Sequence, residues 1–170
     1  MIEMDEIIRL LHGNAQAIRT LVQTIPEEQT QWKPDPDTWS MKQVMEHVYN
    51  EERLDFRKHL KEMFSVPPQP WGEFPRQEVI SVESCRQALD SFLMEREASI
   101  AWLSALESPD WDVEQRATFG PSEVLVMHAG DVLVSWLAHD YLHIRQMNEL
   151  LFAWNVKQGA PYSVQYAGGW

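Results

Sequence analysis

Apolar side chains recur at steps of three and four residues along four long stretches of the chain, which is the pattern of amphipathic helices. The first stretch begins near Met4 and reaches about Thr24, and Pro26 ends it because proline lacks an amide hydrogen and clashes with the preceding turn. Its apolar positions form one stripe: Ile7, Leu11, Ala15, Ile18, Leu21, Val22 and Ile25. The stripe predicts a helix that packs against other helices.

The second stretch carries the clearest helix start in the sequence. Ser40 is a good N-cap, and Gln43 three residues later completes a capping box. From there we expect a helix to about Phe64, because the prolines between residues 67 and 75 prevent its continuation. A polar connection that contains three prolines, residues 26–38, separates this helix from the first one.

Two more helices are predicted, from about Ser81 to Pro109 and from about Asp131 to Trp154. Between them we expect a short helix from Ser122 to His128, with a break or kink at Gly130. No stretch shows the clear alternation of a strand. The pattern therefore predicts an all-α fold, a four-helix bundle with long connections, in a single domain over residues 1–170. Connections of this length also permit a crossover topology.

The composition is that of an ordinary globular protein, with 44% hydrophobic and 24% charged residues. The net charge of −12 argues against nucleic acid as the main partner, because a phosphate backbone attracts basic surfaces. The single cysteine, Cys85, excludes an internal disulfide, and we expect it to be a buried, inert thiol. An acidic N-terminus and the lack of an apolar run of about 20 residues predict a cytoplasmic protein with no membrane span.

Two histidines at a four-residue spacing are the strongest chemical signal. His139 and His143 lie one turn apart on the same face of a helix, so both imidazoles can reach one metal ion. Asp140 stands where an HExxH metalloprotease has glutamate, which argues against that class. His47, two turns into the second helix, could add a third ligand, as in catalytic zinc sites with one open position. The alternative is that these histidines are structural or exposed.

The remaining aromatic and histidine residues have plainer explanations. His12, His59 and His128 are expected to be structural or exposed. The spacing of four tryptophans predicts mostly core positions for Trp39, Trp102, Trp136 and Trp154. Trp136 lies three residues before His139, so its ring could also form a wall of a metal site.

Two segments resemble the signatures of a known family. The first is WSMKQVMEH, residues 39–47, followed by Asn50-Glu51-Glu52, and the second is HDYLHIRQ, residues 139–146. Together they resemble the DinB/YfiT-like family of metal-dependent enzymes, and the lead-in over residues 25–39 is similar to family members as well. The order of elements matches over nearly the whole chain.

The resemblance implies a four-helix bundle that binds one divalent metal ion through His47, His139 and His143. Imidazole suits zinc, nickel and iron. A small-molecule substrate is also implied, because some members are S-transferases or isomerases that use a low-molecular-weight thiol such as bacillithiol or mycothiol. Many members have no assigned activity. Dimers are common in the family, so we expect a homodimer.

Two further residues share the faces of these histidines. Glu51 lies four residues after His47 and could act as a general base, hold a water molecule or orient a ligand, or else be a surface carboxylate. Gln146 lies three residues after His143 and could hydrogen-bond to a ligand, or else to a neighbouring helix.

Three functions remain open from the sequence. The first is a metal-dependent enzyme, either a hydrolase that acidifies a water molecule or a transferase that deprotonates a thiol. The second is a non-enzymatic bundle that binds a metal or a small ligand, and the third is a structural or interaction bundle without metal. Saturation with metal should create activity toward esters or thiol-reactive electrophiles in the first case alone.

Overall fold

The computed structural model describes residues 3–71, 78–119 and 123–168 of the chain. Its main helices are α1 (Met4–Val22), α3 (Met41–Leu54), α4 (Phe56–Met63), α5 (Cys85–Ser104) and α6 (Ala129–Gly159). The other elements are a short helix α2 (Glu27–Gln31), strands β1 (Glu114–Phe119) and β2 (Glu123–His128), and a 3₁₀ turn at Gln165–Ala167. The predicted four-helix bundle is confirmed, with α3 and α4 together as its second member.

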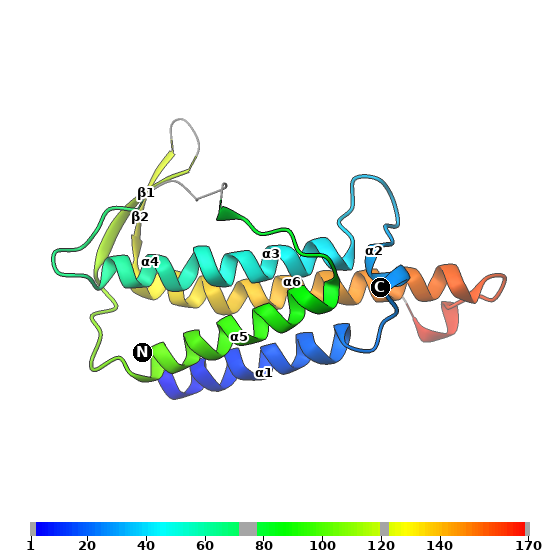
Figure 1. Ribbon diagram of the computed structural model, residues 1–170, viewed down its shortest axis with the longest axis horizontal. Coiled ribbons are helices and arrows are strands. Elements are labelled where there is room, and N and C mark those ends of the chain that lie inside the picture. The colour runs from blue at the N-terminus through cyan, green and yellow to red at the C-terminus, as the bar shows by residue number, and fades with distance from the viewer. Residues whose placement is uncertain (1–2, 72–77, 120–122, 169–170) are drawn as a thin grey trace.

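Two pairs of neighbouring helices run parallel, α1 with α6 and α3 with α5 (Figure 1). α1 and α6 run in one direction along the bundle, whereas α3, α4 and α5 run in the other. The connection from α4 to α5 therefore returns along the length of the bundle, which is the crossover topology that long connections permit. No helix within the described residues is both long and apolar enough to span a membrane.

Side-chain caps fix where two of the helices begin. Ser40 Oγ accepts a hydrogen bond from the Gln43 amide in the predicted capping box, and Ser84 Oγ accepts one from the Gln87 amide at 3.1 Å. α5 therefore begins at Cys85, later than the predicted start near Ser81. A serine cap satisfies an amide at the helix start that has no partner within the helix.

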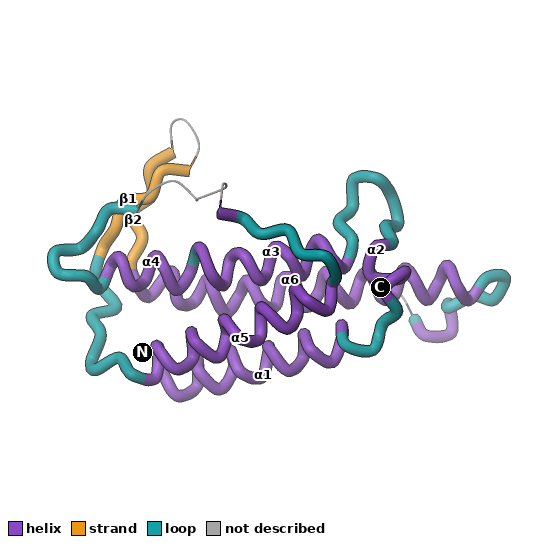
Figure 2. The backbone as a smooth tube through the Cα atoms, in the orientation of Figure 1, coloured by secondary structure: helices purple, strands orange, loops and turns teal. Residues whose placement is uncertain are grey.

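The prediction of a short helix over residues 122–128 is wrong where the structure describes them. Residues 123–128 form β2, which pairs antiparallel with β1 beside one end of the bundle (Figure 2). The expected cap, Ser122, lies outside the described residues. A short apolar run cannot by itself distinguish a helix from a strand, and the β-branched Val124 and Val126 favour the strand when a partner is present.

Two further boundaries differ from the predictions. The second helix does not run unbroken to Phe64, because the backbone leaves the helical conformation at Asp55 (φ −114°, ψ −96°) and α4 then begins. Gly130 was expected to break or kink the last helix, but it lies within α6 near its start. Glycine is only about 1 kcal/mol less favourable than alanine in a helix, which the packing of neighbouring residues readily outweighs.

The core of the bundle consists of two apolar clusters. One is built around Ile18, Met45, Leu89, Phe92 and Met147, and the other around Leu11, Leu60, Leu103, Leu133 and Trp136. Cys85 lies in the first cluster with no exposed surface, as expected. Burial raises the pKa of its thiol to about 12, so the thiolate that would react is scarce at neutral pH.

A buried ion cluster joins all four members of the bundle. Arg96 of α5 donates two hydrogen bonds to Glu52 of α3, each 2.9 Å long, and two to Asp140 of α6, of 2.7 and 2.8 Å. It also donates to the carbonyl of Leu11 in α1 at 3.0 Å. All three charged side chains are at most 2% exposed. The cluster therefore fixes how the helices lie relative to one another.

Neutral donors complete this cluster. Trp136 Nε1 donates to Glu52 at 2.8 Å, and Asn14 Nδ2 donates to Asp140 at 3.2 Å. Burial acts to lower the pKa of Arg96, but the two carboxylates outweigh it and hold that pKa above its ordinary value. The guanidinium therefore stays charged at every pH at which the protein is folded.

We expect Arg96→Met to lower the free energy of unfolding by about 3–5 kcal/mol, because Glu52 and Asp140 would stay buried without their cation. Urea unfolding followed by circular dichroism measures this change. Arg9→Met is the control, since Arg9 is exposed and its ion pair with Glu6 should contribute little. Equal effects of the two substitutions would contradict a central role for the buried cluster.

Candidate metal centre

The interface between α3 and α6 brings the three predicted histidines together. The capping box starts α3 at a defined residue, since Gln43 Oε1 also accepts from the Ser40 amide at 3.0 Å. His47 follows two turns later and faces α6, where His139 and His143 lie one turn apart. One ring nitrogen from each histidine lies within 4.8 Å of the other two.

His139 lies at the centre of the cluster. Its Nε2 atom is 3.1 Å from Nε2 of His47 and 3.0 Å from Nε2 of His143. A neutral imidazole donates through only one of its two nitrogens, so a hydrogen on His139 Nε2 can serve one neighbour and not both. A divalent cation about 2.0–2.1 Å from each nitrogen would satisfy all three lone pairs.

Burial keeps these histidines neutral. Desolvation, followed by the nearby His143, lowers the pKa of His47 to about 4. Desolvation, together with His143 and His47, lowers the pKa of His139 to about 3, and burial lowers the pKa of His143 as well. Metal ions bind the neutral form of histidine, so the donor set fits a divalent metal ion at neutral pH.

Gln146 fixes the orientation of one ring. Its Oε1 atom lies 2.8 Å from Nδ1 of His143 and accepts a hydrogen bond from that nitrogen. With the hydrogen on Nδ1, the Nε2 lone pair of His143 points toward the other two histidines. This is the usual arrangement around a metal-binding histidine, whose second nitrogen donates to a neighbouring oxygen.

Two carboxyl groups lie beside the cluster on the α3 side. Glu51 Oε1 is 3.6 Å from Nδ1 of His47, and burial, followed by a hydrogen bond with Asp55, raises the pKa of Glu51 to about 8. Burial acts to raise the pKa of Asp55, but hydrogen bonds with His59 and Glu51 outweigh it and leave that pKa lowered. Glu51 therefore carries the proton of this pair at neutral pH.

Sequence analysis did not identify Asp55 and His59 as neighbours of the site. His59 has a structural role, as expected: its Nδ1 hydrogen-bonds to Asp55 and its ring stacks on Trp71 at 4.4 Å. A signal was available, because His47, Glu51, Asp55 and His59 recur at four-residue steps. That spacing places titratable side chains along one face of a helix.

A cavity of about 310 Å³ opens beside His47 and Glu51. Trp39 forms one wall, with its ring edge-on to the His47 ring at a centroid distance of 5.2 Å. The spacing predicted a core position for Trp39, but 41% of this residue is exposed. Trp136 is fully buried, as predicted, and Phe56 connects it to the site, because the Phe56 ring stacks on Trp136 and contacts the ring of His139.

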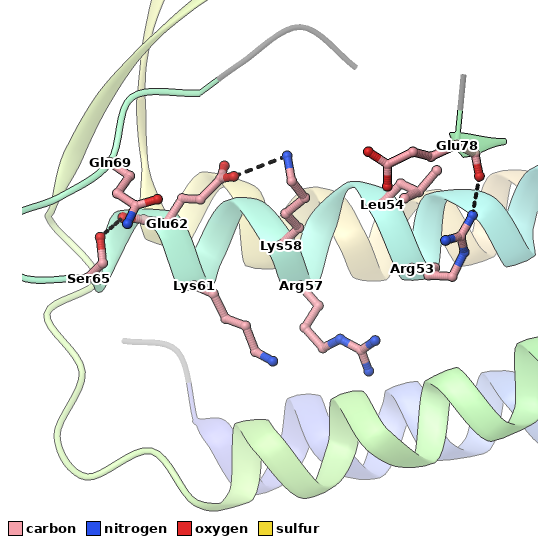
Figure 3. Close-up of a pocket in the computed structure, with 9 residues that line it drawn as sticks. All are labelled: Arg53, Leu54, Arg57, Lys58, Lys61, Glu62, Ser65, Gln69 and Glu78. Atoms are coloured by element: carbon pink, nitrogen blue, oxygen red, sulfur yellow. Dashed lines mark hydrogen bonds and ion pairs between the residues drawn. The ribbon is translucent and has the colours of Figure 1, made fainter. Parts of the chain in front are cut away.

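A larger groove of about 500 Å³ follows the outer side of α3 and α4 (Figure 3). Four cations line it: Arg53, Arg57, Lys58 and Lys61. Each has a partner, respectively the Glu78 carbonyl, Glu95, Glu62 and the ring of Trp102. Arg57 and Lys61 point toward α5, whereas Lys58 points away from it (Figure 3). The four cations therefore do not converge on one point in the groove.

Comparisons with known proteins agree with the fold. The sequence profile of the DinB superfamily matches residues 10–147, which include all three histidines. No curated protein matches the sequence. Among solved structures, the chain is similar to YfiT from Bacillus subtilis, described as a probable metal-dependent hydrolase with an unusual four-helix bundle topology. The TM-score is 0.69 at 15% identity, with 94% of this chain and 91% of that chain covered.

Proposed function

The chain belongs to the DinB superfamily, and from this premise we propose that it is a metal-dependent hydrolase with His47, His139 and His143 as its metal ligands. The observation that carries the proposal is the convergence of three neutral ring nitrogens, with His139 Nε2 only 3.0–3.1 Å from the other two. The description of YfiT as a probable metal-dependent hydrolase supports the same reaction class.

Three histidines leave room in the coordination shell, which is the arrangement of a catalytic site rather than a closed structural one. A divalent ion there supplies Lewis acidity, which polarises a substrate carbonyl and makes a water molecule more acidic. Imidazole ligands suit zinc, nickel and iron, so all three metals stay candidates, as in the sequence-based prediction. Gln146 holds His143 in the tautomer that such a site requires.

Glu51 is the base in the proposed reaction. Without a metal ion Glu51 holds the proton of its pair with Asp55, and the positive charge of a bound cation would favour the ionised form that a base requires. In its ionised form Glu51 takes a proton from the attacking water, whose oxygen forms the new bond to the carbonyl carbon. The bond to the leaving group then breaks, and Glu51 returns the proton to that group. Asp55 accepts a hydrogen bond from Glu51 while Glu51 is protonated, which keeps the two carboxyl groups side by side.

Thiol transfer, a homodimer and a cytoplasmic location remain predictions from the sequence and its family resemblance. We favour hydrolysis over thiol transfer because Glu51 lies beside the histidines, and its carboxyl group can take a proton from water. A non-enzymatic metal-binding bundle is the alternative, and it has the same ligands without turnover.

We expect His139→Ala to abolish metal binding while leaving the helical content nearly unchanged, because His139 faces both other ligands. Metal content by inductively coupled plasma mass spectrometry, on protein without a histidine tag, should be about one ion per chain before the substitution. His12→Ala is the control, since His12 is exposed on α1. A wild-type protein that holds no ion after incubation with zinc or nickel would refute the metal site.

Gln146→Ala should weaken metal affinity by about 10- to 100-fold, because the tautomer and the orientation of His143 would no longer be held. Competition with a chromophoric chelator measures the affinity. Gln158→Ala, an exposed position on the same helix, should leave the affinity unchanged. An unaltered affinity in Gln146→Ala would show that the hydrogen bond to His143 has no role in the site.

Glu51→Gln should lower kcat for a neutral ester such as p-nitrophenyl acetate by about 10²- to 10⁴-fold, because the amide cannot accept the proton of water. The metal content should stay at the wild-type level. Glu97→Gln on the exposed side of α5 serves as the matched control. Full activity in Glu51→Gln would remove this residue from the mechanism.

A further inference from the structure

A short segment of the chain, residues 78–82, is bound lengthwise to α3 and forms one wall of the cavity beside His47. Asn50 exchanges two hydrogen bonds of 2.9 Å with the backbone of Ile80, and Glu46 accepts from the Val82 amide at 2.9 Å. Arg53 donates to the carbonyl of Glu78 at the other end of the segment (Figure 3). We call residues 78–82 the strap.

The strap presents apolar side chains to the cavity. Val79 and Ile80 are 47% and 41% exposed, and Trp39 lies in the wall of the same cavity, next to the ring of His47. Three large apolar side chains with this much exposure, gathered around one concavity, are typical of a small-molecule site. The volume of about 310 Å³ is at the small end of the range for such sites.

The polar groups of this cavity are mostly used by the protein itself. Gln43 is engaged in the capping box, while Asn50 and Glu46 hold the strap. Ser81 donates to Glu46, so His47 and Glu51 are the polar side chains of the described lining that remain to meet a substrate. His47 belongs both to the lining of this cavity and to the histidine cluster.

The charged side chains in the described lining of the cavity are all acidic. Its described lining includes Glu46 and Glu51 but no lysine or arginine. Lys42 approaches Glu46 to 3.7 Å and partly balances its charge. An anionic group in this cavity would lose its hydration and gain no cationic partner, which is costly.

From these features we infer that the substrate is an uncharged ester or amide with a short apolar acyl chain, which binds between Trp39 and the strap. The inference rests on the proposed function and adds its substrate class. Trp39, Val79 and Ile80 determine specificity by removing the chain from water, and the carbonyl is thereby placed toward the histidines and Glu51. The reaction is the hydrolysis described above, with water as the second reactant.

Alkyl hydroxamates test the inference without turnover, because their head group binds metal ions and their chain can be varied. The full-length protein is loaded with cobalt(II), whose absorption spectrum reports the metal, and Kd is measured by calorimetry. From acetohydroxamate to hexanohydroxamate we expect affinity to rise about 10- to 100-fold, since each fully buried methylene contributes about fourfold. Succinic monohydroxamate should bind at least about tenfold more weakly than pentanohydroxamate.

Substitutions in the cavity wall test whether the alkyl chain of the hydroxamate binds there. Trp39→Ala should remove most of the increase in hydroxamate affinity with chain length. Val79→Ala should lower the affinity for the longer chains by about two- to fourfold. The cobalt spectrum should be unchanged in both variants. Val156→Ala, at a similarly exposed valine near the end of α6, is the matched control. Should Trp39→Ala fail to fold, Val79→Ala alone still decides the point.

The outcomes separate the two proposals. Affinity that does not depend on chain length, or that Val79→Ala leaves unchanged, would overturn the apolar substrate and leave the metal centre standing. Equal affinity for the anionic and neutral chains would overturn the claim that the substrate is uncharged. A wild-type protein that binds no cobalt would overturn the metal centre, and the substrate inference with it.

Discussion

The arrangement of the helices depends on the hydrogen bonds and ion pairs that the guanidinium of Arg96, on α5, makes in the core. It binds carboxylates from α3 and α6 and a carbonyl from α1, so one side chain of α5 ties together all four members of the bundle. Buried charges are expensive to remove from water, and they are tolerated only when their partners are in place. Any shift of one helix along another would separate Arg96 from Glu52 or Asp140, so a specific alignment is favoured over other apolar packings.

This alignment also builds the histidine cluster. Glu52 and Asp140 are the sequence neighbours of Glu51 and His139, and adjacent residues on a helix point about 100° apart. When Glu52 and Asp140 face Arg96 in the core, Glu51 and His139 necessarily face the interface of α3 and α6. The geometry of the histidine cluster is therefore held by side chains that do not belong to it, which gives the cluster the rigidity that the proposed catalysis would need.

Local patterns in the sequence predicted the parts of this structure that depend on local spacing. The capping box at Ser40, the pair His139 and His143, and the bundle itself all follow from helical periodicity. The hairpin, the break at Asp55, the exposure of Trp39 and the strap were not predicted. The hairpin pairs strands that are close in sequence, but a short apolar run does not by itself distinguish a strand from a helix. The strap is the clearest case: nothing near Ile80 indicates that Asn50, thirty residues earlier, hydrogen-bonds to its backbone.

The charges around the histidine cluster bear on both the proposed metal ion and the proposed substrate. Neutral imidazoles beside the Glu51–Asp55 pair favour a cation at the cluster and supply no positive charge of their own. The nearest arginines on α3 and α4 are committed elsewhere, since Arg53 holds the strap and Arg57 binds Glu95. If a cation binds at the histidine cluster as proposed, it supplies positive charge beside His47, in a cavity whose described lining has no lysine or arginine. In the proposed function, that charge would polarise a substrate carbonyl, while the rest of the cavity would disfavour an anionic group on the substrate.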